Sequence, residues 1–451
     1  NIMLIAQIIA VAIFILMFIL IVLEPLPKHV ITLGCGLLTI VAVFAITMHS
    51  WQAIWDTLAI KNIATTQFWY AAGESESSGI DWATIFFLGG MMVMVEGMAE
   101  AGVFRWLCMK LAKMVHYKPL PLFIAFMILA AVMAMFIDSI TVILFLAAVT
   151  FELARLLKFN PVPMLISEVF CANLGGSATM CGDPPNIIIG SQLGFSFMDF
   201  LTNTGLLAGV SLVLVIIYFL LFFHNKIKPR EEVDISKMPD PKDAVKSKRD
   251  FILSSIIFLI AIVLLITHSA THLTVAFIGI LVVILTCICF ATRIGKLMKR
   301  VDYKTLLFFV GLFIVVGGLE QTGVLEIVAG FIAKICGDSV FAMVAVIIWI
   351  SAVASAFVDN IPFAATMVPI IRSLSVTAGI PIETLAWTLA MGTDVGGSAT
   401  PIGASANVVG IGVAGKNGYR VGWYKYCKAS APAMIIVIAV SMLLIFLRYC
   451  M

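Results

Sequence analysis

The chain contains an internal duplication with a constant spacing of 221 residues. The matching segments are 81–104 with 302–325, 136–140 with 357–361, and 175–186 with 396–407. In the last pair, GGSATMCGDPPN and GGSATPIGASAN share seven of 12 positions. A duplicated apolar chain whose repeats each contain Gly, Pro or Asn interruptions and a carboxylate is typical of a secondary transporter, with the interruptions at the substrate site.

The composition indicates an integral membrane protein. Of 451 residues, 62% are hydrophobic and 12% are charged, whereas soluble proteins contain about 25% charged residues. The fold expected from this composition is all-α, because helices satisfy their backbone groups within lipid. The nine cysteines form no CxxC pair and the basic residues lie in short loops. We therefore expect no disulfide or zinc framework, no nucleic-acid partner, and no cofactor other than a coupling ion, H⁺ or Na⁺.

Apolar stretches of about 20 residues predict ten membrane crossings. Two further apolar stretches, 121–156 and 339–372, are too long for one crossing and are each interrupted by an Asp. We interpret each as a re-entrant hairpin with the Asp at its tip; the alternative is two full crossings, with arms of roughly 15–17 residues. The ten predicted crossings are 2–23, 29–48, 84–103, 164–195, 204–223, 251–267, 273–291, 305–325, 382–411 and 430–448.

The distribution of Lys and Arg predicts the orientation in the membrane. The linker 224–250 holds eight Lys or Arg and is placed in the cytoplasm. Lys28 and the expected loops 105–118, 292–304 and 412–428 then lie on that side, and loop 49–81 and both termini lie outside.

The predicted domains are two halves joined by this linker. Residues 1–223 and 251–451 each hold five crossings, one hairpin and one broken helix. Because five is odd, the second half is expected to be inverted relative to the first. The localisation expected is a prokaryotic inner membrane.

The repeated segments 175–186 and 396–407 lie mid-crossing and are predicted to interrupt their helices. Paired glycines loosen the backbone, and consecutive prolines cannot continue a hydrogen-bonded helix. Half-helix ends and free carbonyls at such breaks bind anions or Na⁺; the alternative is that the glycines only allow close helix packing. The predicted breaks are Gly175, Gly176, Pro184, Pro185, Gly396 and Gly397, and the predicted ligands are Ser177, Thr179, Asn186, Ser398, Thr400 and Asn407.

Carboxylates within membrane segments indicate functional sites. The matched pair Asp138 and Asp359, beside Ser139 and Asn360, is predicted to bind the coupling ion, with Na⁺ near both carboxylates as one option. The alternative is that each Asp caps the helix that follows it. Two unmatched acids are further candidates for coupling: Asp394, whose mate is Asn173, and Asp183, whose mate is Ala404.

These motifs resemble the ion-transporter superfamily that includes arsenite-efflux permeases, the melanosomal P protein, D-type sodium/proton antiporters and, more distantly, divalent-anion/sodium symporters. The resemblance is carried by NPVPMLISEVFCANLGGSATMCGDPPNIIIG at 160–190, FVDNIPFAATMVP at 357–369 and GGSATPIGASANVVGIG at 396–412, and it covers nearly the whole chain. It implies a scaffold part and a transport part, a homodimer, and an elevator-like motion.

The chain departs from the divalent-anion symporters at the hairpin tips. Those proteins carry Ser-Asn-Thr there, whereas this chain has Asp138-Ser139-Ile140 and Asp359-Asn360-Ile361. An acid at each tip repels a di- or tricarboxylate unless a cation or proton neutralises it.

We therefore expect an antiporter for a small inorganic ion, of the cation/proton or arsenite type, embedded in membrane lipid and coupled to H⁺ or Na⁺. The alternative is a di- or tricarboxylate or other anion transporter. A channel is less favoured, because channels more often assemble a pore from a ring of subunits. An enzyme is not expected, because the Gly-x-Gly-Asp element of intramembrane aspartyl proteases is missing.

Overall fold

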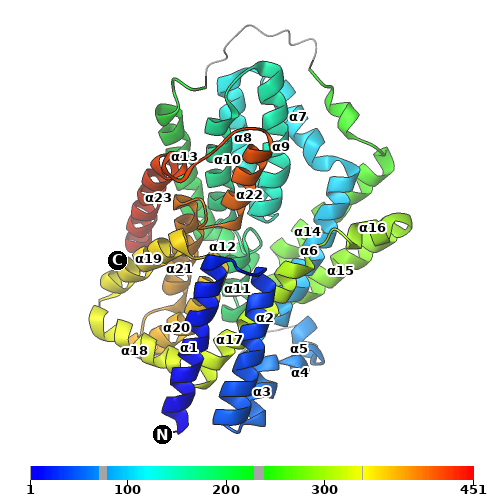
Figure 1. Ribbon diagram of the computed structural model, residues 1–451. Coiled ribbons are helices and arrows are strands. Elements are labelled where there is room, and N and C mark those ends of the chain that lie inside the picture. Colours follow the sequence, from blue (N-terminus) through cyan, green and yellow to red (C-terminus); the bar gives the residue numbers. More distant parts are fainter. Residues whose placement is uncertain (1, 71–78, 228–237, 338) are drawn as a thin grey trace.

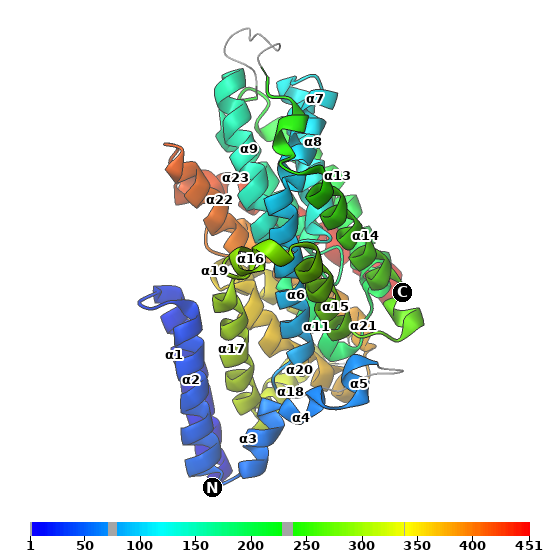
Figure 2. The same cartoon turned by 90° about the vertical axis from the view of Figure 1, so that its right-hand side faces the viewer.

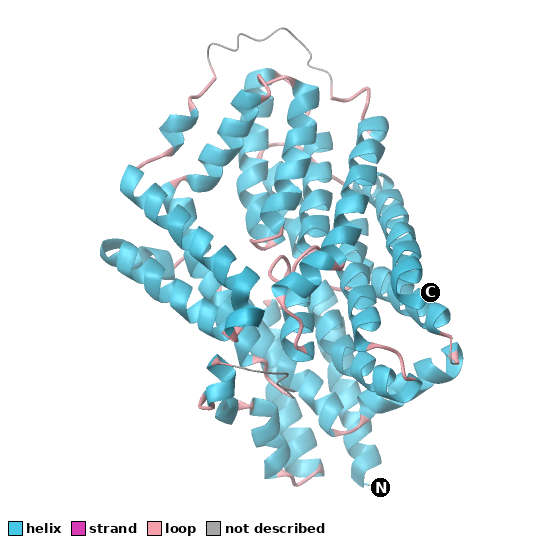
Figure 3. Ribbon diagram, turned by 180° about the vertical axis from the view of Figure 1, so that it is seen from behind, coloured by secondary structure: helices cyan, strands magenta, loops and turns pink. Residues whose placement is uncertain are grey.

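The computed structural model describes residues 2–70, 79–227, 238–337 and 339–451. Within these ranges the protein is helical and contains no strand (Figure 3). Ten of the described helices are long and apolar enough to cross a membrane. The protein is thus a multi-pass membrane protein with an all-α fold.

The first half contains the elements that precede the linker. They are α1 (Ile2–Leu23), α2 (Lys28–Leu38) with η1 (Thr39–Thr47), α3 (Trp51–Leu58), α4 (Ile60–Ile63), α5 (Thr66–Trp69), α6 (Trp82–Ala101), α7 (Val103–Met114), α8 (Pro119–Ala134), α9 (Ser139–Leu157), α10 (Pro161–Gly176), α11 (Pro184–Leu193), α12 (Phe197–Thr202) and α13 (Thr204–Phe222).

The second half begins after the linker, of which residues 228–237 lie outside the described residues. Its elements are η3 (Pro241–Ala244), α14 (Lys248–Thr271), α15 (Val275–Cys289), η4 (Ala291–Arg293), α16 (Ile294–Met298), α17 (Tyr303–Gln321), α18 (Val324–Cys336), α19 (Val340–Phe357), α20 (Asn360–Ala378), α21 (Ile382–Gly396), η5 (Gly397–Ala399), α22 (Ser405–Lys416), α23 (Trp423–Ile445) and η6 (Phe446–Cys450).

The repeat in the sequence is reproduced in the positions where helices begin. Tyr303 of α17 follows Trp82 of α6 by 221 residues, and the same spacing separates five further pairs of helix starts: α7 and α18, α8 and α19, α9 and α20, α10 and α21, and α11 and α22. In Figures 1 and 2, α8 and α9 extend towards the linker end of the molecule and α18 lies towards the opposite end. The inversion of one half relative to the other stays a prediction.

The stretches 164–195 and 382–411, where the sequence predicts interruptions, each form two short helices. One crossing differs from the expectation, because α15 bends by 91° into η4 and α16. The arms of the predicted hairpins are longer than expected: α9, α19 and α20 have 19, 18 and 19 residues. Helix α20 continues past the apolar stretch, which ends at residue 372, to Ala378. Re-entrance of the hairpins therefore remains a prediction, since three arms are long enough to cross.

Segments expected to be loops also contain helices. Residues 105–118 mostly belong to α7, an amphipathic helix that buries Phe104, Cys108 and Ala112. The apolar spacing of these residues could have revealed the helix, but Arg105 and Lys110 on its other face favoured a loop. Loop 49–81 contains α3 to α5, and its residues 71–78 lie outside the described residues.

Glycines allow two helix pairs to cross at close range between the halves. Helix α2 packs on α17 and helix α15 packs on α6. A methyl group added at Gly311 would lie 2.3 Å from the backbone carbon of Thr32, and one at Gly90 would lie 2.3 Å from the carbonyl oxygen of Gly279. Gly90 and Gly311 are mates in the repeat, so the same contact is built twice.

We expect Gly311→Ala to destabilise the fold by about 1–3 kcal/mol, because the new methyl group overpacks the α2–α17 crossing. The measurement is thermal unfolding in detergent. Gly34→Ala is the matched control, since Gly34 lies on α2 with open space around it. An equal unfolding temperature for both variants would contradict the close crossing.

Candidate functional site

The two broken helices pack against the hairpin helices through glycine. A methyl group added at Gly175 would lie 2.1 Å from the carbonyl oxygen of Ala131, and one at Gly396 would lie 2.4 Å from the Cα of Ala352. Ala131 and Ala352 lie on α8 and α19. The packing role considered for the glycines therefore applies to these two, and it places each break beside a hairpin.

Asn186 and Asn407 each bridge the unwound segment of their own helix. The Asn186 amide donates to the carbonyl oxygens of Gly176 (3.2 Å) and Thr179 (3.0 Å). The Asn407 amide donates to those of Gly397 (2.8 Å) and Thr400 (2.7 Å). Since buried carbonyls need donors, the two asparagines stabilise the breaks from within.

Hydroxyl groups connect each break to its hairpin. Thr179 donates to the carbonyl oxygen of Met135, and Thr400 donates to that of Ala356, its mate in the second half. Ser177 donates to the carbonyl oxygen of Leu174 at 2.7 Å, within its own segment. Thus three of the four predicted hydroxyl ligands bond to backbone in this structure, and the fourth, Ser398, accepts from a side chain.

The breaks differ between the halves at Asp183. Its carboxylate is buried and accepts a hydrogen bond from the backbone amide of Ser139 at 3.1 Å. Ala404 takes the related place in the second half, where Ser405 donates instead to Asp359 at 3.4 Å. A hydrogen bond therefore joins each break to the neighbouring hairpin tip. In the first half the acid, Asp183, belongs to the break, whereas in the second half the acid, Asp359, belongs to the tip.

The two tip carboxylates both cap the helix that follows them. Asp138 accepts from the backbone amide of Thr141 (3.0 Å) and from its hydroxyl (2.7 Å). Asp359 accepts from the backbone amide of Ile361. The capping role considered for both is confirmed, while their role in ion binding stays a prediction.

Lys28 distinguishes the two tips and was missed from the sequence. Its ammonium group lies 2.9 Å from Asp359 Oδ2, and the Asp359 side chain is 6% exposed. Among the described residues, Asp138 has no salt-bridge partner. Lys28 was expected in a cytoplasmic loop, and no local pattern links the start of α2 to a residue 331 positions later.

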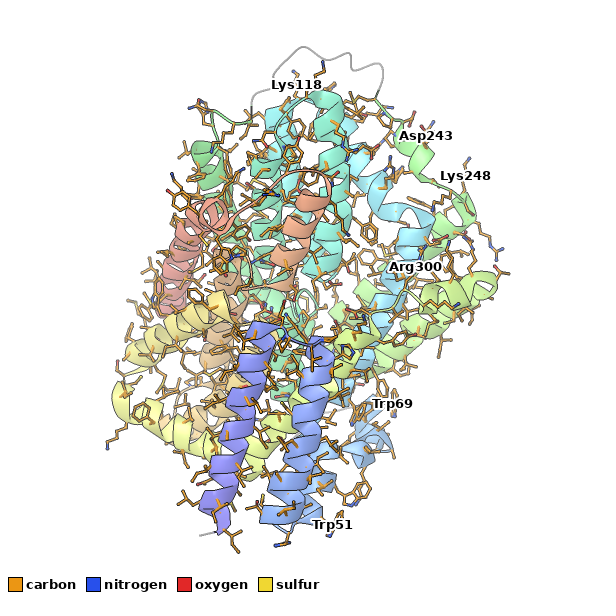
Figure 4. The ribbon with its side chains drawn as sticks, in the orientation of Figure 1. Trp51, Trp69, Lys118, Asp243, Lys248 and Arg300 are labelled. Carbon is orange, nitrogen blue, oxygen red and sulfur yellow. The ribbon has the colours of Figure 1, made fainter. Side chains whose placement is uncertain are left out.

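Both tips and both breaks border one cavity of about 350 Å³. Asp138 and Asp359 line it, as do Gly182 and Pro184 of the first break and Ser405 beside the second. The other predicted ligands are not among its lining residues. Its ionisable lining residues are Lys28, His29, Glu96, Asp138, Cys181, Arg300, Asp302, Lys304 and Asp359; Figure 4 labels Arg300.

A second polar group lies in the core, where the two breaks meet. The Asn173 amide donates to Asn407 Oδ1 at 2.8 Å and to the Ser398 hydroxyl at 3.1 Å. Asp394 is fully buried, and neither of its carboxylate oxygens has a hydrogen-bond partner among the described residues. Asn360 is buried beside the tip. Pro185 is also buried, but it lies with Pro184 in the first turn of α11 and not in the unwound segment, because proline is tolerated at a helix start.

We expect Asn407→Ala to lower the free energy of unfolding by about 1–3 kcal/mol, because the buried carbonyls of Gly397 and Thr400 lose their donor. Thermal unfolding in detergent measures the effect. Val408→Ala, which truncates an exposed neighbour on the same helix, is the control. Equal losses of unfolding free energy in the two variants would exclude the role of Asn407 in stabilising the break.

We expect Lys28→Met to destabilise the protein by about 1–3 kcal/mol, between the values for exposed and buried ion pairs, because Asp359 is left without its partner. Adding Asp359→Asn should recover part of this loss, because the unpaired charge is then removed. A double-mutant cycle on thermal unfolding checks this, and simple additivity of the two changes would argue against the ion pair.

The comparisons with known proteins agree with this architecture. The sequence profile of the CitMHS family, described as citrate transporter, matches residues 18–392. A 46 kDa membrane protein of Mycobacterium leprae is 34% identical over 381 residues, covering 83% of this chain and 88% of that protein. An uncharacterised transporter of Mycobacterium tuberculosis is 32% identical over 378 residues, with the same coverage.

The human P protein is 27% identical over 446 residues, covering 80% of this chain and 53% of the P protein. The resemblance to the superfamily that includes the P protein is therefore confirmed.

Two solved transporters share the fold at low sequence identity. MtrF of Neisseria gonorrhoeae, described with a class of antimetabolite efflux pumps, has a TM-score of 0.55 at 14% identity, covering 82% of this chain and 81% of MtrF. The YdaH transporter of Alcanivorax borkumensis has a TM-score of 0.57 at 12% identity, covering 93% of this chain and 96% of YdaH. The profile match and the Mycobacterium relatives show that the chain belongs to the CitMHS (citrate transporter) family of the ion-transporter superfamily.

Proposed function

We propose that the protein is a secondary active transporter that works by alternating access and is coupled to H⁺ or Na⁺, most favourably as a cation/proton or arsenite-type antiporter. The observation that carries this proposal is the cavity, whose wall combines both hairpin tips, both helix breaks and the matched carboxylates. Discontinuous helices and buried acids at one site are the features that secondary transporters use to bind substrate and coupling ion.

The packing of the helices supports a moving part and a fixed part. The hairpins and broken helices pack together across the halves: α9 contacts α22, and α20 contacts α11. The helix pairs α2–α17 and α6–α15 form a second group, which touches the first where α17 meets α20 and where α6 meets α11. The cavity lies between these groups, because Lys28 and Glu96 line it from the second and Asp138 and Asp359 from the first. An elevator-like movement of the first group would carry the cavity across the membrane.

The coupling ion is assigned to the first tip. Asp138 lines the cavity without a salt-bridge partner among the described residues, whereas Asp359 is paired with Lys28. A carboxylate within a membrane segment is expensive unless it is neutralised. Of the two tip carboxylates, Asp138 is thus the one without a paired cation in the described part of the chain, and it can take up H⁺ or Na⁺.

The second candidate cargo is a di- or tricarboxylate. Lys28, Arg300 and Lys304 line the cavity, and the family to which the chain belongs is described by citrate transport. The tip acids repel an anion only while they are charged and unpaired, and Lys28 neutralises this repulsion at Asp359. A cation bound at Asp138 would remove it at the other tip.

The assembly proposed is a homodimer in a prokaryotic inner membrane, with the linker in the cytoplasm and both chain ends outside. Support for the orientation comes from the basic residues around the linker. In Figure 4, Lys118, Asp243 and Lys248 lie towards the linker end, and Trp51 lies near the opposite end.

The proposal is tested in liposomes that contain the purified protein and an internal pH dye. Na⁺, Li⁺, arsenite, succinate and citrate are added one at a time. A proton signal with Na⁺ or Li⁺ identifies cation/proton antiport, and one with arsenite identifies the oxyacid branch. A signal with succinate or citrate identifies carboxylate transport. No coupled flux with any of these, under H⁺ or Na⁺ gradients, would overturn the proposal.

We expect Asp138→Asn to reduce coupled flux by about tenfold or more, since the amide cannot bind a proton and holds a cation poorly. The fold should persist, because the amide oxygen still caps α9. Asp240→Asn is the matched control, since Asp240 caps η3 outside the cavity. Equal coupled flux in the two variants would remove Asp138 from the coupling mechanism.

A further inference from the structure

The two halves make related hydrogen bonds at the breaks, so the repeat extends to individual side chains. The bonds from Asn186 to Gly176 and Thr179 correspond to those from Asn407 to Gly397 and Thr400. The bond from Thr179 to Met135 corresponds to that from Thr400 to Ala356. Each partner is displaced by 221 residues.

The two bonds donated by Asn173, to Asn407 Oδ1 and to the Ser398 hydroxyl, both lack a counterpart. Asn173 on α10 donates from its amide to Asn407 Oδ1 on α22 at 2.8 Å. The repeat relates Asn173 to Asp394 on α21, and Asn407 to Asn186 on α11. Helices α21 and α11 pack against each other, but no hydrogen bond joins Asp394 to Asn186. The Asp394–Asn186 pair therefore has a carboxylate at the position where the Asn173–Asn407 pair has an amide donor.

The groups at this second position are acceptors without donors. Asp394 and Asn186 are both 0% exposed. Both carboxylate oxygens of Asp394 and Oδ1 of Asn186 have no hydrogen-bond partner among the described residues. The Asn186 amide cannot be turned to supply the donor, because its nitrogen already bonds to two carbonyls of the break. Buried polar atoms are nearly always paired, so three unpaired acceptors indicate a missing hydrogen or cation.

We propose that the Asp394 carboxyl binds a proton and donates it in a hydrogen bond to Asn186 Oδ1, in place of the bond that Asn173 donates to Asn407. One proton neutralises the charge and supplies the donor for Asn186 Oδ1. The acceptor that remains without a donor is then the uncharged carbonyl oxygen of the Asp394 carboxyl group. This assignment rests on the proposed function, because it makes Asp394 a site for the coupling proton in the core between the two breaks.

The surrounding charges link this proton to the cavity. The negative charge of Asp183 opposes ionisation of the Asp394 carboxyl. Asp183 accepts from the backbone amide of Ser139, which follows the cavity residue Asp138. The helices packed against α21 also carry the ionisable residues Glu168, Cys171, Tyr218, Arg372, Tyr424, Lys425, Tyr426, Cys427 and Lys428.

Without the proton, the negatively charged Asp394 carboxylate would be repelled by the amide oxygen of Asn186 and by the carboxylate of Asp183. The contact between α21 and the start of α11 would weaken, and with it the hold of Asp183 on the first tip. Binding and release of one proton at Asp394 would thus alter the contact on which the first hairpin tip rests, with no covalent step.

The test uses Asp394→Asn in the full-length protein, because asparagine restores the donor that the first half has at Asn173. Infrared spectroscopy of reconstituted protein should show the C=O stretch of a protonated carboxylic acid in the wild type. The wild-type minus Asp394→Asn difference spectrum should assign this band to Asp394. Thr393→Val is the control, because Thr393 is the adjacent buried residue and bonds only within its own helix.

In the liposome assay, Asp394→Asn should fold and bind cargo but lose about tenfold or more of its proton-coupled flux, whereas Thr393→Val should retain it. The assignment is overturned if the acid band is unchanged in Asp394→Asn, if Na⁺ abolishes the band at constant pH, or if the variant retains wild-type proton coupling. A wild type without coupled flux would reject the proposed function instead, and the infrared band would still test the proton on Asp394.

Discussion

The structure depends on how unwound backbone is stabilised inside a membrane protein. Carbonyl groups in a helix break have no water to bond, so each needs a donor from the protein. Asn186 and Asn407 supply these donors, each to two carbonyls of its own break. Because the breaks are fixed in this way, the hairpin tips can rest on them and the charged cavity can form between the tips and the scaffold.

The repeat gives the two halves similar geometry but different charges. Lys28 neutralises Asp359, while Asp138 has no such partner among the described residues. Asp183 has no acidic mate, and Asp394 takes the place of an asparagine. The proposed binding of a coupling ion and a cargo requires two unlike places, and such substitutions within one duplicated frame would provide them without changing the fold.

Much of the fold could be predicted from the sequence because apolar length and a constant spacing are local signals. They located most crossings, both breaks and both tip acids. Contacts between distant residues carry no such signal: the pairing of Lys28 with Asp359 and the bond from Asn173 to Asn407 depend on tertiary packing. The last hairpin arm was underestimated because hydropathy falls where polar residues begin, although α20 continues to Ala378.

Alternating access requires that the cavity be exposed to one side of the membrane at a time. Counterflow tests this directly: liposomes are loaded with the unlabelled cargo identified by the proton signal, and trace labelled cargo is added outside with no ion gradient. Labelled cargo should accumulate transiently above its external concentration, because a carrier exchanges one molecule for another. Simple equilibration without accumulation, at a rate linear in concentration, would indicate a channel and contradict alternating access.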